Sequence, residues 1–234
     1  KKTRLAYGPD IGDMKGKAIL GALNDHETKG FNHRVSLIVD EYRYRVDQGL
    51  VSSESESLAL LVGVRQISSE FKLPTVKMIL IDLLRQKKSV VLFSSFIKPL
   101  ILLQNTIGGE LLTGKQTLRQ REESVNRFQQ GKSPLLLATY GAGGIGFTLH
   151  QANNVILLER PWTPGDADQA EDRCHRIGMD GPLISHWIQL GFADQLVDSL
   201  IANKADNIDI FMDNRYFKIK RQSLSKMVRT CLQS

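Results

Sequence analysis

Cysteine is scarce in this 234-residue chain, because Cys174 and Cys231 are the only two and they lie far apart. Two distant cysteines exclude the disulfide framework of a small secreted domain and are typical of a reducing, intracellular compartment. Long hydrophobic runs are also missing. No segment approaches the roughly 18 apolar residues that span a bilayer, and no secretory leader is visible, so we expect no membrane segment.

Motifs for binding a nucleotide with its magnesium ion, and for binding a structural metal ion, are missing as well. No G-x-x-x-x-G-K-[ST] loop, which would cradle the phosphates of a nucleotide, occurs anywhere in the sequence. There is no D-E-x-H cluster for holding magnesium, since Asp40-Glu41 is followed by tyrosine and arginine. Cys174 and His175 are adjacent, but no further cysteine or histidine stands at metal-ligand spacing, so we predict no metal site.

The positive charge lies at the two ends of the chain. The net charge is +6, yet residues 1–22 carry five Lys and Arg against two Asp, and residues 213–234 carry six against one. The body between them is therefore slightly acidic. Basic ends often meet nucleic acid, but a solvated tail explains them equally well. The apolar spacing in residues 213–234 also suits a helix that packs on the body of the chain or on a partner.

Short apolar runs alternate with helical patterns over most of the chain. Runs rich in Val, Ile and Leu predict strands buried on both faces, at 89–95, 109–112, 134–139, 154–159 and 183–190. Amphipathic spacing predicts helices at 33–48, 55–69, 74–86, 96–106, 117–130, 165–176 and 192–204. We expect residues 1–30 to be partly helical or irregular.

This alternation predicts an α/β fold with a mainly parallel sheet covered by helices on both faces. The predicted domain organisation is a helical lead-in over 1–86, an α/β domain over 87–212 and a basic tail over 213–234.

Residues 141–146 read GAGGIG and imitate a dinucleotide-binding fingerprint, with Glu159 as its acidic partner. The spacing argues against that function. Only seven residues separate Gly146 from Asn154, where the next strand is expected, and a crossover helix needs about ten or more. The glycines are better explained by a tight, exposed turn at the carboxyl end of a strand.

The segment QAEDRCHRIG, residues 169–178, carries the sharpest signal of chemistry. On a helix Gln169, Arg173 and Arg176 share one face, since they stand at i, i+4 and i+7. Two guanidiniums and an amide form a multidentate clamp suited to phosphate. The alternative is a surface helix whose arginines pair with Glu171 and Asp172, but those acids lie on other faces.

With these residues the sequence resembles the second, C-terminal RecA-like domain of the Swi/Snf-type, superfamily-two helicase-like ATPases. The last motif of that family, Q-x-x-x-R-x-H-R-x-G-Q, matches residues 169–179 except that methionine replaces the final glutamine. PWTP at 161–164 resembles the family's P-W-N-P. VVLFSSF at 90–96, LLTGKQTLRQREESVNRFQ at 111–129 and TYGAGGIGFTL at 139–149 follow the family's other motifs in order. The residues QAEDR (169–173) and the short lead-in resemble those of the annealing-helicase branch of this family.

The resemblance implies a RecA-like three-layer fold and a role for each motif. It implies arginine fingers at Arg173 and Arg176, and nucleotide-binding positions at Gln169, Gly144 and Gly146. It places the DNA-facing residues at Ser94, Ser95, Thr113, Gly114, Thr139 and Gly141. Gly141 stands where the family usually has lysine, which removes one phosphate contact and weakens the transfer of the DNA-contact roles.

The resemblance also implies partners. ATP and Mg²⁺ would be bound in the complete two-lobe enzyme by a first RecA-like lobe, in the same chain or a separate one, and not by this lobe alone. The two lobes would move along double-stranded DNA by holding its backbone, in the nucleus of a eukaryote or in the cytoplasm or nucleoid of a bacterium or archaeon. The alternative is a non-catalytic module that keeps the fold and binds DNA or protein.

Overall fold

The computed structural model describes residues 2–7, 25–50, 53–143, 147–161, 164–175, 182–190 and 194. The chain divides into two compact units. Unit 1 comprises residues 1–21 and 72–189, and unit 2 comprises residues 22–71 and 190–234. Helix α3, which the sequence assigns to the lead-in, groups with the α/β unit. The domain boundaries expected at 86/87 and 212/213 stay predictions.

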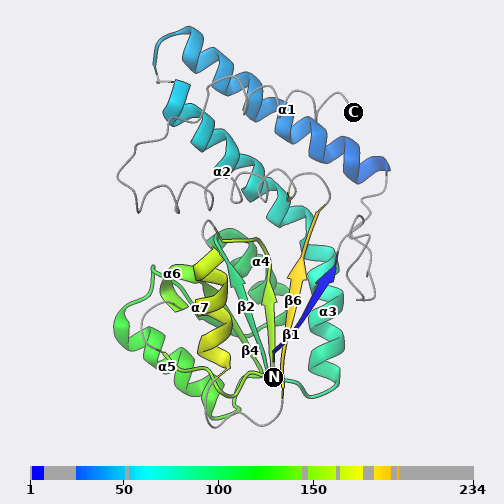
Figure 1. The fold of residues 1–234 in the computed structure, drawn as a ribbon, viewed down its shortest axis with the longest axis vertical. Coiled ribbons are helices and arrows are strands. Elements are labelled where there is room, and N and C mark those ends of the chain that lie inside the picture. The colour runs from blue at the N-terminus through cyan, green and yellow to red at the C-terminus, as the bar shows by residue number, and fades with distance from the viewer. Residues whose placement is uncertain are drawn as a thin grey trace, which may run out of the picture. The chain divides into compact units, whose positions relative to one another are not determined.

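Unit 1 is built on a six-stranded sheet with the order β1-β6-β5-β2-β4-β3, in which every neighbouring pair is parallel (Figure 1). Its strands are β1 (Lys2–Tyr7), β2 (Val90–Ser94), β3 (Glu110–Leu112), β4 (Leu135–Thr139), β5 (Asn154–Leu157) and β6 (Leu183–Ile188). The central strands β2 and β5 are buried along their whole length. The prediction of a parallel sheet buried on both faces is therefore confirmed.

Helices cover both faces of this sheet. On one face, Val91 and Phe93 of β2 pack in a core with α5 (Leu118–Gln129), α6 (Tyr140–Gly143) and α7 (Pro164–Cys174). On the other, Val90 and Leu92 pack in a second core with α3 (Leu73–Arg85) and α4 (Ile97–Ile107). Because alternate residues of a strand point to opposite faces, one apolar run supplies both cores.

Most expected elements agree with the structure to within a few residues. The expectation of a helical or irregular lead-in is wrong for residues 2–7, which form the edge strand β1 and pair with β6. No helix forms over 147–153, as the seven-residue spacing requires. The helix expected at 192–204 lies almost wholly outside the described residues. Among the described helices, none is long and apolar enough to cross a membrane.

Unit 2 contains the helical pair α1 (Asp25–Asp47) and α2 (Ser53–Phe71). Phe31 of α1 meets Phe71 of α2 edge-on, with ring centroids 5.5 Å apart. Arg34 forms an ion pair with Glu70 at 3.0 Å and also lies over the Phe71 ring. A Cβ on Gly63 would stand 3.2 Å from Ile38, so the glycine permits close packing of the two helices.

His186 on β6 gives the fold a pH dependence. Its Nε2 lies 3.1 Å from Asn154 Oδ1, and burial lowers the pKa of His186 to about 4. The His186 ring is therefore protonated near pH 6.5 in the unfolded chain but stays neutral to a lower pH in the folded state. We expect the stabilisation from the neutral ring to be complete above pH 6.5 and to fall by about 3 kcal/mol as the pH drops to 4.

The measurement is urea unfolding at pH 7 and pH 4.5. His186→Gln should flatten the difference between the two pH values, whereas His33→Gln, at an exposed position on α1, should leave it as in the wild type. An equal pH dependence in the wild type and His186→Gln would contradict the assignment.

Candidate functional site

The predicted DNA-facing residues gather at one edge of the sheet. Strands β2, β4 and β3 are adjacent and parallel, so their carboxyl ends meet at that edge. Ser94 is in register with Thr139, and Thr113 follows Leu112, which is in register with Ala138. The three motifs are thus neighbours in space, at the edge where parallel sheets commonly bind ligands.

The turn after β3 presents Gly114 to solvent. The Thr113 side chain is buried, and its backbone N–H donates to Gln116 Oε1 at 2.8 Å. Gly114 is exposed, and a Cβ there would meet nothing within 4 Å. Packing therefore does not require a glycine at this position. Because no neighbouring atoms cover Gly114, a ligand could approach its backbone.

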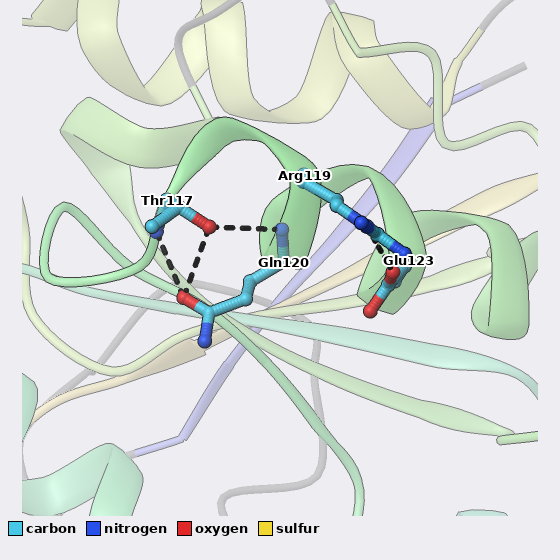
Figure 2. Close-up of polar contacts among 4 residues, drawn as sticks. All are labelled: Thr117, Arg119, Gln120 and Glu123. Carbon is cyan, nitrogen blue, oxygen red and sulfur yellow. Dashed lines mark hydrogen bonds and ion pairs between the residues drawn. The ribbon is translucent and has the colours of Figure 1, made fainter.

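The start of α5 holds this turn in place. Thr117 is the N-cap, and its hydroxyl accepts from Gln120 N–H at 3.3 Å while Gln120 Oε1 accepts from Thr117 N–H at 2.9 Å (Figure 2). This reciprocal capping box satisfies two donors that a helix start leaves unpaired. One turn on, Arg119 and Glu123 form an exposed ion pair at 3.0 Å, which adds little to stability.

The end of β4 leads into the glycine segment. Thr139 is half-buried, and its Oγ1 accepts from Ala142 N–H at 3.4 Å, while Gly141 is exposed. Tyr140 stacks on Phe93 with centroids 5.7 Å apart. Gly144 and Gly146 lie outside the described residues, so their nucleotide-binding role stays a prediction.

The turn after β2 is held by a residue that sequence reasoning did not assign to the site. Ser94 is fully buried, and its hydroxyl lies 3.0 Å from Glu159 Oε1. Ser95 is half-buried, and its backbone N–H donates to Glu159 Oε2 at 2.8 Å. In the sequence, Glu159 is an acidic residue at the end of an otherwise apolar run, and it stands out only as the acidic partner in the rejected dinucleotide-binding fingerprint. DNA contacts at Ser94 and Ser95 stay predictions.

Helix α7 presents the predicted phosphate clamp. Gln169 is exposed and Arg173 is half-buried, whereas Glu171 between them is fully buried. Glu171 Oε1 accepts from Ser185 Oγ at 2.8 Å and from Trp187 Nε1 at 3.2 Å, both on β6. Two positions along a helix turn by about 200°, so the anchored Glu171 directs its neighbours away from the sheet. Arg176 lies outside the described residues.

The arginine end of α7 lies away from the DNA-facing edge. The helix begins after the carboxyl end of β5 and runs back toward the start of β6, so Arg173 is roughly 14 Å along the axis from Pro164. The Arg173 carbonyl accepts from Leu149 N–H at 2.9 Å, which joins this end of the helix to the chain that leaves the glycine segment. The fold thus separates the two predicted sets of contacts.

Cys174 and the neighbouring acids do not offer a metal centre. Cys174 is buried against the core, and burial raises the pKa of its thiol far above the ordinary value. A thiol kept protonated is neither a good nucleophile nor a metal ligand. In the part of the chain that the structure describes, no three His, Cys, Asp or Glu residues come together in a way that would hold a metal ion.

Comparison with known proteins agrees with the resemblance to helicase C-terminal domains. Residues 75–178 match the family described as helicase conserved C-terminal domain. The SNF2 domain-containing protein ENL1 of Oryza sativa subsp. japonica is 34% identical over 117 residues, which are 46% of this chain and 12% of that protein. The chain therefore spans about an eighth of this relative.

Two solved structures share the fold. The SWI2/SNF2 ATPase core domain of Sulfolobus solfataricus superposes with a TM-score of 0.66 at 19% identity, covering 97% of this chain and 48% of that one. The same core in complex with double-stranded DNA superposes with a TM-score of 0.62 at 21% identity, covering 88% and 44%. The RecA-like fold class is thereby confirmed.

Proposed function

We propose that this chain is the second motor lobe of a Swi/Snf-type DNA-dependent ATPase that translocates along duplex DNA. The match of residues 75–178 to the helicase conserved C-terminal domain supports the proposal. The observation that carries the proposal is the separation of two sets of donors in one compact unit. Hydroxyls and amides line the carboxyl edge of the sheet, and Gln169 and Arg173 face away from the sheet on α7. Such a protein acts where DNA is, in the nucleus or nucleoid.

The clamp on α7 fits a nucleotide phosphate. Guanidinium and amide N–H groups donate to phosphate oxygens, whereas magnesium is usually held by carboxylates. We therefore assign ATP and Mg²⁺ to a first RecA-like lobe that supplies the phosphate-cradling loop. Arg173 and Arg176 would approach the γ-phosphate when the lobes close and stabilise the charge of the transition state.

The carboxyl edge fits a DNA backbone. Exposed amides at Gly114 and Gly141 and the Thr139 hydroxyl can donate to phosphates, and they offer nothing that reads a base. The similar Sulfolobus core was solved in complex with double-stranded DNA, which supports a duplex as the partner of this chain. Alternate closing and opening of the two lobes would then move this edge along the backbone.

We expect the isolated chain to bind duplex DNA weakly, without sequence preference and with strong salt dependence. Binding should be weak because the body of the chain is close to neutral and the other half of a two-lobe clamp makes no contribution. It should depend on salt because the contacts that remain are made to backbone phosphates and release counterions. The measurement is a salt titration of binding to a mixed-sequence duplex, with the full chain and with a chain that lacks residues 213–234.

The deletion separates the proposal from its rival. If the basic tail adds only a nonspecific term, its removal should lower the affinity and the salt slope but leave measurable binding. Binding that disappears with the tail would favour a non-catalytic interaction module whose DNA contact lies outside the lobe. Tight or sequence-selective binding would contradict a translocase lobe.

A further inference from the structure

At the carboxyl edge of the sheet, Glu159 contacts the residues that follow β2 through its side chain and Tyr140, which follows β4, through its backbone carbonyl. We propose that Glu159, which follows β5, is a positioning residue for DNA contact, because its carboxylate holds the turn between β2 and α4 in the shape that faces the duplex. The inference rests on the proposed function, since it assigns a role at the same edge.

The carboxylate uses both oxygens on this turn. Oε2 accepts from Ser95 N–H at 2.8 Å, and Oε1 lies 3.0 Å from the Ser94 hydroxyl. Glu159 is only 2% exposed. Hydrogen bonds to a buried carboxylate are stronger than hydrogen bonds between neutral groups, so these two contacts hold the turn in one conformation.

The same hydroxyl continues the support into α4. Phe96 is the N-cap of α4, and no hydrogen bond from its own side chain caps the helix. Its N–H donates instead to Ser94 Oγ at 3.0 Å. The Ser94 hydroxyl has one proton and lies 3.0 Å from both the Glu159 carboxylate and the Phe96 carbonyl. Because the carboxylate is the stronger acceptor, the hydroxyl donates its proton to Glu159. Glu159, Ser94 and Phe96 therefore form a chain of hydrogen bonds that ends at the start of α4.

Glu159 is itself held from the neighbouring strand end. Its carbonyl accepts from the Tyr140 hydroxyl at 2.6 Å, and the Tyr140 ring stacks on Phe93 of β2. On the residue before it, the Leu158 carbonyl accepts from the buried Lys72 ammonium at 3.0 Å. Glu159 is thus fixed at its backbone by Tyr140, which follows β4, and its carboxylate holds the turn that follows β2.

Charge alone would give the opposite effect on DNA binding. A carboxylate beneath a phosphate-binding surface repels the duplex, so removal of its charge should tighten binding if charge were all that mattered. Loss of the support that the carboxylate gives the turn should weaken binding, because an amide presents one acceptor where two donors point. The sign of the change therefore separates a positioning role from a merely electrostatic one.

The experiment measures duplex affinity at fixed salt for the full chain and for Glu159→Gln, with Glu122→Gln as the matched control. Glu122 is exposed on α5, so its substitution removes the same charge from the surface and should change the affinity by less than about twofold. We expect Glu159→Gln to bind about five- to tenfold more weakly, which corresponds to the net contribution of one typical hydrogen bond. The Ser95 amide resonance should also move, and its hydrogen exchange should accelerate.

Ser94→Ala keeps the carboxylate and removes the hydroxyl, so it tests the support of the turn without changing charge and serves if Glu159→Gln does not fold. It should weaken binding too. The positioning role would be overturned if a folded Glu159→Gln bound DNA as tightly as the wild type or more tightly, or if Ser94→Ala kept the wild-type affinity. In either case the proposed function would still stand, provided that the wild-type chain itself binds DNA. A wild-type chain without DNA affinity would overturn both.

Discussion

Arg173→Ala and Arg176→Ala are expected to reduce ATP turnover of the complete two-lobe enzyme by about 10³-fold or more, because an arginine finger contributes roughly 10³–10⁵ to the rate of phosphoryl transfer. Arg173 is half-buried on the outer face of α7, so its truncation should cost the fold about 1 kcal/mol or less. The measurement is steady-state ATP hydrolysis with saturating duplex DNA, alongside thermal unfolding of each variant.

Two further variants sharpen this test. Arg173→Lys keeps the charge but loses the planar fork that binds two phosphate oxygens, and it should recover only a small part of the activity. Arg85→Ala removes an exposed arginine at the end of α3 and should leave turnover near the wild-type rate. Near-normal turnover in both Arg173→Ala and Arg176→Ala would show that the clamp on α7 does not contact the transition state.

The isolated 234-residue chain should fold and yet hydrolyse no ATP, even with DNA. Its sequence contains neither a phosphate-cradling loop with lysine nor a D-E-x-H cluster for magnesium, so half of the chemistry is missing. The measurement is phosphate release from rigorously purified protein with and without duplex DNA.

A matched variant guards this result against contaminating ATPases. Any trace activity from a contaminant should be the same in preparations of the wild-type chain and of Arg173→Ala. DNA-stimulated hydrolysis that disappears in Arg173→Ala would mean that this lobe turns over ATP by itself.

Elements whose signal is local were predictable from the sequence. The apolar runs around β2, β4 and β5 indicate strands buried on both faces, and their lengths agree with the structure to within about two residues. The seven-residue spacing after the glycine segment excludes a crossover helix and with it the dinucleotide-binding interpretation. Residues 2–7 could not be recognised in the same way, because an edge strand next to β6 is defined by its partner 181 positions further along the chain.

The sequence by itself determined the family resemblance, the α/β fold class and the motifs, because each depends on residue types at short, regular spacings. Only the tertiary structure decided which residues support those motifs. Nothing in the sequence identifies Glu159 or Glu171 as a support for these motifs, yet they are buried and accept hydrogen bonds from Ser94 and Ser185, which lie 65 and 14 positions away. A buried carboxylate persists only where the fold brings donors to it, and the chain order does not reveal which donors those are.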